Sequence, residues 1–203
     1  AERAGVVDQV VPLTTAAMDG RLKLEEAYAA RLDLIKPDRA VIEWLGQHYV
    51  DTLVEGAAEA VSALRALGWQ VHVVSGGIRQ AVVELASHLG VPDERVHAVS
   101  LDFDADGRYA GFDLSSPLAR NGGKAEVCRQ VMAQVDSAVM VGDGITDMEA
   151  AAAGAMVIGF GGVVRREAVA SRAHHFIDKP DLREVVRLLA TPAELDRVSL
   201  LLG

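Results

Sequence analysis

The spacing of apolar residues changes near residue 50. In the first part, an apolar stripe recurs every three or four residues, which predicts an amphipathic helix over 24–35. Its members are Leu24, Tyr28, Leu32 and Ile35. Pro37 ends this helix, because proline disfavours helical backbone at the residue before it, and Asp38 can begin the next one. No strand pattern occurs in this part, so residues 1–50 are predicted to form a small helical cap subdomain.

Residues 51–203 show another pattern, in which short apolar runs alternate with helical segments. The predicted strands are 70–74, 138–141, 156–160 and 175–177. The predicted helices are 57–67, 78–89, 124–133, 147–153, 164–170 and 182–189. Strands that alternate with helices indicate a parallel sheet with helices on both faces. The expected fold class is therefore α/β, with a Rossmann-like core.

One stretch interrupts this alternation. Between residues 96 and 112, apolar and polar residues alternate on both sides of the turn Ala105-Asp106-Gly107, which predicts a β-hairpin. The acidic residues from Asp102 to Asp113 also match the spacing of a calcium-binding loop, but that loop needs a helix on each side. Calcium is therefore kept only as a minor alternative.

Composition narrows the class of partner. The chain has 203 residues and a net charge of −9, and its basic residues form no run. Nucleic acid needs a concentrated positive surface, so it is not an expected partner. No apolar run reaches the roughly 20 residues of a membrane span, so a membrane is not expected either. The single cysteine, Cys128, cannot form an internal disulfide, which favours a cytoplasmic location.

Ser75-Gly76-Gly77 follows the predicted strand 70–74 and precedes a predicted helix. Backbone N–H groups at a helix start, together with one hydroxyl, form a cradle for a small anion such as phosphate. The alternative is a plain turn in which Ser75 caps the helix.

Lys124 stands in the first turn of a predicted helix, after Asn121-Gly122-Gly123. The helix dipole disfavours a cation at this end, so Lys124 is expected to have an anionic neighbour. A solvated surface lysine is the alternative.

Asp143 and Asp147 lie where the predicted strand 138–141 gives way to a helix. Two carboxylates four residues apart at such a junction can converge on a hard cation such as Mg²⁺. In the alternative, Asp143 shapes a turn and Asp147 caps a helix. Ligands bind beyond the carboxyl ends of parallel strands, so Ser75 and Asp143 are both in position for one site.

In chain order, Ser75-Gly76-Gly77, Gly122-Gly123-Lys124 and Gly142-Asp143-Gly144-Ile145-Thr146-Asp147 resemble the motifs of the haloacid dehalogenase superfamily of phosphatases. More narrowly, the chain is similar to the phosphoserine phosphatase family. Further similar stretches are Ala17-Met18-Asp19-Gly20, residues 30–35, Tyr109-Ala110-Gly111-Phe112-Asp113 and Gly159-Phe160-Gly161-Gly162. The resemblance covers nearly the whole chain.

This resemblance implies a reaction and a substrate. The substrate would be a small phosphomonoester, O-phospho-L-serine, hydrolysed to L-serine and phosphate in serine biosynthesis. An aspartate would attack the phosphoryl group, and a second aspartate would protonate the leaving hydroxyl and then activate water. Mg²⁺ would neutralise charge between the nucleophile and the phosphate. The oligomeric state stays open, with a homodimer as one alternative.

The resemblance also implies roles for single residues. Asp143 would bind Mg²⁺, and Ser75, Lys124 and Asp147 would be the catalytic residues, with Asp147 as the carboxylate that orients the site. The implied substrate contacts are Met18, Asp19, Arg31, Ser75, Gly76, Gly77, Lys124, Thr146 and Arg166. Arg31 would pair with the substrate carboxylate through its planar fork, and Leu24 would form an apolar wall.

The sequence departs from the family at one motif. The string Asp-x-Asp-x-Thr of the central strand does not occur, and neither does the glutamate that follows it. We therefore expect a core without its first strand, and without the nucleophile, the general acid and most Mg²⁺ ligands. A start within a helix and without methionine suggests a missing upstream segment, and a true short form that does not turn over is the alternative.

Two rival functions follow. One is a related phosphatase or phosphotransferase that acts on another small phosphomonoester. The other is a catalytically inactive protein that binds a phosphorylated ligand.

Overall fold

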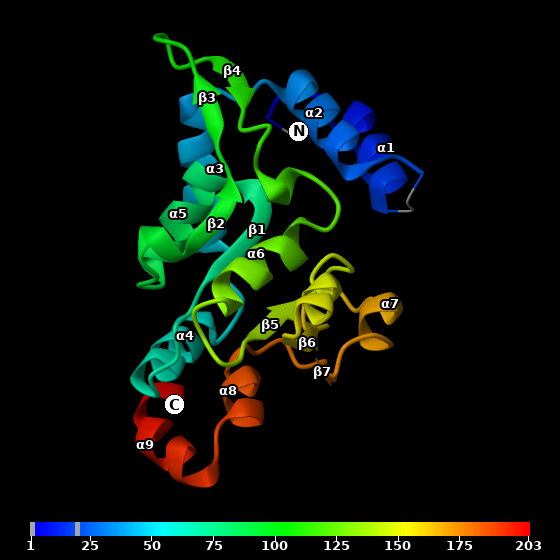
Figure 1. Ribbon diagram of the computed structural model, residues 1–203. Coiled ribbons are helices and arrows are strands. Elements are labelled where there is room, and N and C mark those ends of the chain that lie inside the picture. Colours follow the sequence, from blue (N-terminus) through cyan, green and yellow to red (C-terminus); the bar gives the residue numbers. More distant parts are fainter. Residues whose placement is uncertain (1–2, 19–20) are drawn as a thin grey trace.

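The computed structural model describes residues 3–18 and 21–203, without the side chains of residues 17 and 18. A helical first part is followed by a part that mixes helices and strands (Figure 1). The first part contains α1 (Val7–Met18), α2 (Leu24–Ile35) and α3 (Arg39–Asp51). The second contains the helices α4 (Ala57–Ala66), α5 (Arg79–His88), α6 (Gly123–Met132), α7 (Glu167–Ala170), α8 (Arg183–Leu189) and α9 (Pro192–Leu202). Its short 3-10 helices are η1 (Asp93–Arg95), η2 (Pro117–Ala119) and η3 (Met148–Ala153).

The parallel strands form two sheets. In one sheet, β1 (Val73–Ile78) pairs with β2 (Val96–Val99). In the other, β6 (Met156–Phe160) lies between β5 (Val139–Gly142) and β7 (His175–Ile177). Within the described part of the chain, no strand joins β1 to β5. The α/β class with parallel strands is confirmed, and the strands are divided between two sheets.

The hairpin is shorter than the apolar alternation suggests. Strands β3 (Leu101–Phe103) and β4 (Tyr109–Phe112) are antiparallel, but Val96–Val99 pairs in parallel with β1. The prediction of one hairpin over 96–112 is therefore corrected to 101–112. Alternation alone could not reveal this, because it continues through Ser100 while the pairing partner changes.

The helix boundaries in the first part follow local chemistry. Lys36, which caps α2, adopts a left-handed backbone with φ 41°, and Pro37 comes next. The Asp38 carboxylate then accepts a hydrogen bond from the Val41 N–H at 2.8 Å, which confirms that Asp38 begins α3. Helix α3 packs against α5 of the second part. Because of this packing, the structure does not by itself separate a cap from the rest at residue 50, and that boundary stays a prediction.

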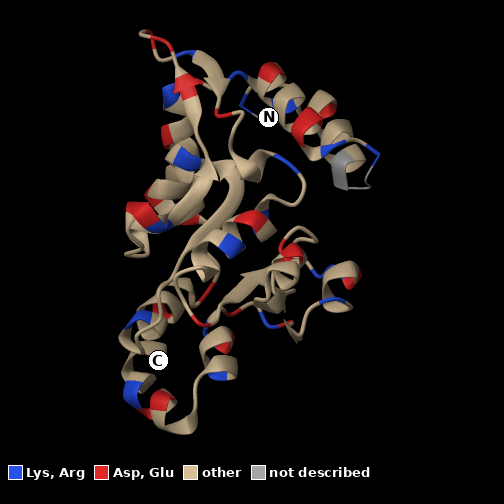
Figure 2. Cartoon of the chain, in the orientation of Figure 1, with Lys and Arg blue, Asp and Glu red and all other residues tan. Residues whose placement is uncertain are grey.

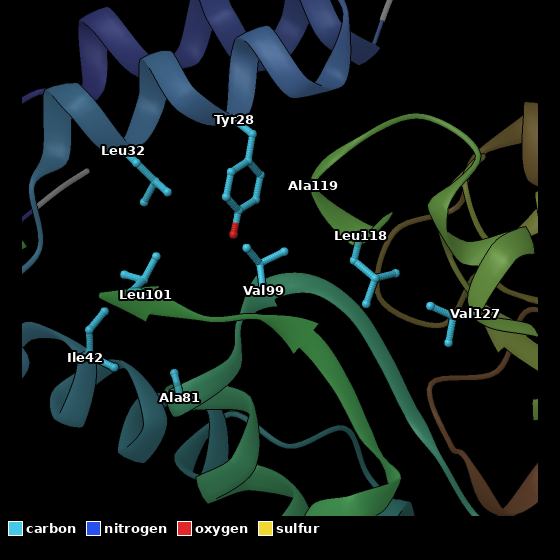
Figure 3. Packing of buried hydrophobic residues seen from close by; sticks show 9 residues of the cluster. All are labelled: Tyr28, Leu32, Ile42, Ala81, Val99, Leu101, Leu118, Ala119 and Val127. Atoms are coloured by element: carbon cyan, nitrogen blue, oxygen red, sulfur yellow. The ribbon is translucent and has the colours of Figure 1, made fainter. Parts of the chain in front are cut away.

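One apolar cluster joins the two parts of the molecule. Figure 3 shows Tyr28 and Leu32 extending from α2 towards Val99 and Leu101. The buried members of the cluster are Tyr28, Leu32, Ile42, Ala81, Val99, Leu101, Leu118, Ala119 and Val127. Because these residues come from helices, strands and η2, this cluster fixes α2 on the sheet that contains β1.

Charged residues are dispersed over the molecule (Figure 2). Acidic and basic residues are interspersed on the helices, and the described segments carry no continuous basic stretch. None of the helices in residues 3–18 and 21–203 is both long and apolar enough to cross a membrane.

Candidate functional site

Ser75, Gly76 and Gly77 lie inside β1 and not after it. In the pairing of β1 with β2, Val74 lies opposite His97 and Ile78 lies opposite Val99, so residues 75–77 bulge from the ladder. The predicted strand end at Val74 is therefore corrected, since β1 continues to Ile78. Helix α5 has Ile78 as its N-cap residue, which excludes the alternative role of Ser75 as a helix cap.

The bulge contains one hydroxyl group, that of Ser75. The Gly77 N–H donates to the Ser75 Oγ over 2.9 Å, so the hydroxyl proton of Ser75 remains available to a second acceptor. Side chains on the glycines would crowd this arrangement. A Cβ on Gly77 would lie 3.0 Å from the Ser75 Oγ, and one on Gly76 would lie 3.3 Å from the Leu118 carbonyl oxygen. A bulge with a free hydroxyl is suited to a small anion.

Lys124 has the anionic neighbour that its place in the first turn of α6 predicts. Its Nζ lies 2.5 Å from the Asp147 Oδ1, and the side chains are 18% and 7% exposed. The second carboxylate oxygen of Asp147 accepts the Gly144 N–H at 2.9 Å. This ion pair is largely withdrawn from water and ties the start of α6 to η3. The alternative of a solvated surface lysine is excluded.

Gly142 makes room for the Asp147 carboxylate. A Cβ at position 142 would lie 2.2 Å from the Asp147 Cγ, which no side chain could tolerate without movement. The segment after Asp147 is the 3-10 helix η3, where the sequence pattern predicted an α-helix. Asp147 is the N-cap residue of η3 without a capping hydrogen bond from its side chain, so the helix-cap alternative for its carboxylate is excluded.

Asp143 has a different partner from Asp147. The Arg166 guanidinium contacts the Asp143 carboxylate and also donates to its backbone carbonyl at 3.1 Å. Thr146 is half-buried in the same turn, beside Gly144. The structure therefore brings Arg166, Asp143 and Thr146 to one loop, as the resemblance implies. The roles of these residues stay predictions.

The carboxylates of Asp143 and Asp147 are paired with basic groups in this structure. Within residues 3–18 and 21–203, no three His, Cys, Asp or Glu side chains are grouped so that they could hold a metal. Asp147 is engaged by Lys124 and Gly144, and Asp143 is engaged by Arg166. In the hairpin, Asp104 Oδ1 accepts two backbone N–H groups of the turn, so the calcium alternative gains no support.

Arg31 and Leu24 both lie on α2. Leu24 is the first residue of the helix, and Arg31 is half-buried two turns later. The Arg31 guanidinium carbon lies 5.7 Å from the centre of the Tyr28 ring. The predicted substrate contact Asp19 lies outside the described residues, as does the side chain of Met18.

Two groups near the ion pair were missed in the sequence. Glu149 lies on η3, and burial raises the pKa of its carboxyl group. Arg165 extends away from its neighbour Arg166, since it pairs with Asp178 at 2.6 Å and lies over the Phe176 ring at 5.0 Å. For Arg165, the only signal in the sequence was its place directly beside the expected site residue Arg166, whereas Glu149 lies two positions after Asp147.

Cys128 lies in an apolar cluster beneath the ion pair. Its neighbours include Met140, Met148 and Val157. Burial raises the pKa of the Cys128 thiol, and the charge of Asp147 raises it further. Since the thiolate is the nucleophilic form, Cys128 has a packing role in this structure.

The candidate site is built from the bulge Ser75-Gly76-Gly77 in β1 and from the loop after β5 that carries Asp143 and Asp147. A family model for haloacid dehalogenase-like hydrolases matches residues 4–154, and the chain belongs to that family. Its relatives make the assignment narrower. The chain is 40% identical over 179 residues to a phosphoserine phosphatase of Bos taurus, across 87% of this chain and 80% of that protein. It is 38% identical to the phosphoserine phosphatase of Homo sapiens, with the same two coverages.

Solved structures agree with this assignment. A substrate-bound phosphoserine phosphatase complex matches with a TM-score of 0.77 and 28% identity, across 94% of this chain and 89% of that chain. A phospho-aspartyl intermediate analogue of phosphoserine phosphatase matches with a TM-score of 0.75 and 29% identity, with the same coverages. The chain belongs to the phosphoserine phosphatases within the haloacid dehalogenase-like hydrolases.

Proposed function

We propose that this protein recognises O-phospho-L-serine and serves its hydrolysis to L-serine and phosphate. The observation that carries the proposal is the pair of anion-binding groups, the Ser75 hydroxyl in the bulge of β1 and the Lys124 ammonium at the start of α6. The substrate is taken from the relatives, which are phosphoserine phosphatases. A cytoplasmic location, a role in serine biosynthesis and assembly into a homodimer are part of the same proposal.

Each cradle residue has a defined part in binding. The Ser75 hydroxyl donates to a phosphate oxygen while it accepts the Gly77 N–H. Lys124 uses one proton for Asp147 and keeps two for the phosphoryl oxygens. Arg31 pairs with the substrate carboxylate, and Arg166 contributes positive charge beside Asp143. These contacts orient the phosphate and the carboxylate of one small molecule.

Mg²⁺ is proposed as the cofactor because the resemblance to the haloacid dehalogenase superfamily implies it, and a family model for haloacid dehalogenase-like hydrolases matches residues 4–154. It would neutralise charge on the phosphoryl group, with Asp143 as one ligand. The nucleophilic step of the family needs the string Asp-x-Asp-x-Thr, which this sequence does not contain. For the chain as it stands, we therefore expect binding of phosphoserine without turnover.

Calorimetric titration of O-phospho-L-serine into the 203-residue protein tests the proposal. We expect saturable heat, weakened about tenfold or more by Arg31→Ala, because a charged hydrogen bond contributes about 1.5–3 kcal/mol. Release of phosphate should be followed in parallel with Mg²⁺ and with EDTA. Absence of binding would overturn the proposal, and equal binding by Arg31→Ala would favour a phosphomonoester that lacks a carboxylate.

The second candidate is a catalytically inactive binder of a phosphorylated ligand. It is favoured by the two ion pairs, because Asp143 and Asp147 are both neutralised by basic side chains. Both candidates predict binding without phosphate release for the 203 residues, which lack the string Asp-x-Asp-x-Thr. Mg²⁺-dependent release would exclude the inactive binder and support the enzyme.

A further inference from the structure

Arg31 is held by one aromatic contact. Its Cζ lies 5.7 Å from the Tyr28 ring centre, within the range of a cation–π interaction. In the described part of the chain, Arg31 forms no ion pair or side-chain hydrogen bond. A guanidinium that lies over a ring keeps its N–H donors free for a carboxylate.

The Tyr28 ring is itself fixed. Tyr28 is 3% exposed, and burial raises the pKa of its hydroxyl to about 12. Its ring centre lies 5.2 Å from that of Phe112 in β4, with the planes tilted by 55°. Aromatic pairs prefer this kind of tilted geometry, so the hairpin sets the orientation of the ring beside Arg31.

Tyr28 belongs to an apolar cluster that reaches the elements that carry the phosphate cradle. Leu118 of η2 and Val127 of α6 belong to its cluster, and Val74 of β1 packs against that cluster (Figure 3). Val74 directly precedes Ser75, and Val127 lies on the helix that begins beside Lys124. One apolar cluster, with Tyr28 at its Arg31 end, therefore connects Arg31 to the elements that carry Ser75 and Lys124.

We propose that Tyr28 is a positioning residue that holds the Arg31 guanidinium at a fixed place relative to Ser75 and Lys124. The inference rests on the proposed function and deepens it. The favoured ligands are phosphomonoesters that carry a carboxylate, with the two anionic groups separated as in an amino-acid phosphate. The selectivity for the carboxylate then depends on an aromatic face that does not touch the ligand.

The test compares two ligands by calorimetry, O-phospho-L-serine and O-phosphoethanolamine, which lacks the carboxylate. Wild type and the variants Tyr28→Phe, Tyr28→Leu, Phe112→Leu and Arg31→Ala are titrated with both. Tyr28→Phe keeps the aromatic face and should keep the preference for phosphoserine. Tyr28→Leu should bind phosphoserine about fivefold more weakly, with phosphoethanolamine unchanged. Phe112→Leu keeps the Tyr28 residue but removes the ring that orients it, so the affinity for phosphoserine should fall about twofold. This variant replaces Tyr28→Leu if Tyr28→Leu does not fold.

Leu32→Val is the matched control, because it shrinks another buried side chain of α2 in the same cluster. It should leave the preference for phosphoserine unchanged. Retention of the preference in folded Tyr28→Leu, or in Phe112→Leu where Tyr28→Leu does not fold, would overturn the positioning role. An equal loss in Leu32→Val would also overturn it, since that result would mean general loosening of α2. No preference in wild type, or none lost in Arg31→Ala, would instead overturn the proposed function.

Discussion

The Lys124 Nζ lies 2.5 Å from the Asp147 Oδ1, and this contact joins two segments that are distant along the chain. Lys124 belongs to the start of α6, whereas Asp147 follows β5. Both side chains are largely buried, so each depends on the other to offset the loss of water. The pair is therefore part of the fold as well as part of the candidate site.

Removal of one member of this pair should be strongly destabilising. Asp147→Ala leaves a buried ammonium without its carboxylate, and we expect a loss of about 3 kcal/mol or more in the free energy of unfolding. Lys124→Met combined with Asp147→Leu should cost less than the sum of the single changes. Urea unfolding measures the free energies of the single and double variants.

The control is Asp178→Asn, which removes an exposed partner of Arg165 and should cost less than about 1 kcal/mol. Equal losses in Asp147→Ala and the control would contradict the buried character of the pair.

Gly142→Ala should disturb the same carboxylate from the other side. The added methyl would lie 2.2 Å from the Asp147 Cγ, so either the side chain or the turn must move. We expect a loss of roughly 1–3 kcal/mol, typical of overpacking, together with weaker phosphate binding. Gly144→Ala is the comparison, because its methyl would lie 3.2 Å from the Asp147 Oδ2 and needs a smaller adjustment. If Gly144→Ala were the more harmful change, the described packing around Asp147 would be wrong.

Ser75→Ala separates binding from stability. The change removes a hydroxyl that should donate to phosphate, and we expect about tenfold weaker binding of inorganic phosphate. The melting temperature should change little, because the bulge is only half-buried. Ser171→Ala, on the exposed end of α7, is the control and should leave phosphate affinity unchanged. Unaltered affinity in Ser75→Ala would remove the bulge from the binding site.

The paired imidazoles of His72 and His97 predict a loss of stability in acid. The His72 Nδ1 lies 3.1 Å from the His97 Nε2. Burial lowers the pKa of both rings, with further lowering of His72 by His97 and Arg95 and of His97 by Arg79. The unfolded chain therefore takes up protons first, near the ordinary value of 6.5. This contribution to stability is complete above that pH and is lost as the pH falls towards the lowered folded value.

Urea midpoints at about pH 8 and about pH 5.5 measure this effect. His97→Gln should reduce the difference between the two midpoints, whereas His88→Gln, at an exposed position, should not. A difference that is unchanged in His97→Gln would assign the acid sensitivity to other groups.

The local chemistry of single residues predicted much of the fold. Asp38 was expected to begin a helix and does so, because its side chain accepts the Val41 N–H. The strand 156–160 was also placed correctly from its apolar run alone. The sequence also carries a start signal for a further helix at residues 191–194. Thr191 and Glu194 form a capping box around Pro192, and they begin α9, for which no helix was predicted.

The features that were missed depend on contacts between distant segments. Whether Val96–Val99 pairs with β1 or with the hairpin is decided by its tertiary neighbours, not by its alternation. The same holds for Arg183, which contacts Glu55 from 128 positions away. At the candidate site, the partner of Lys124 was expected to be anionic, but its identity as Asp147 required the fold.

The division of the parallel strands into two sheets affects how the protein will behave in solution. All six residues of β1 and three of the four in β5 are only half-buried, although parallel strands are usually covered. Along one side of each strand, no other described strand takes up the backbone N–H and C=O groups. Such edges accept strands from other molecules, so self-association of the 203-residue polypeptide should increase with its concentration. Dilute samples and solubilising fusions are therefore the appropriate starting point for every measurement described above.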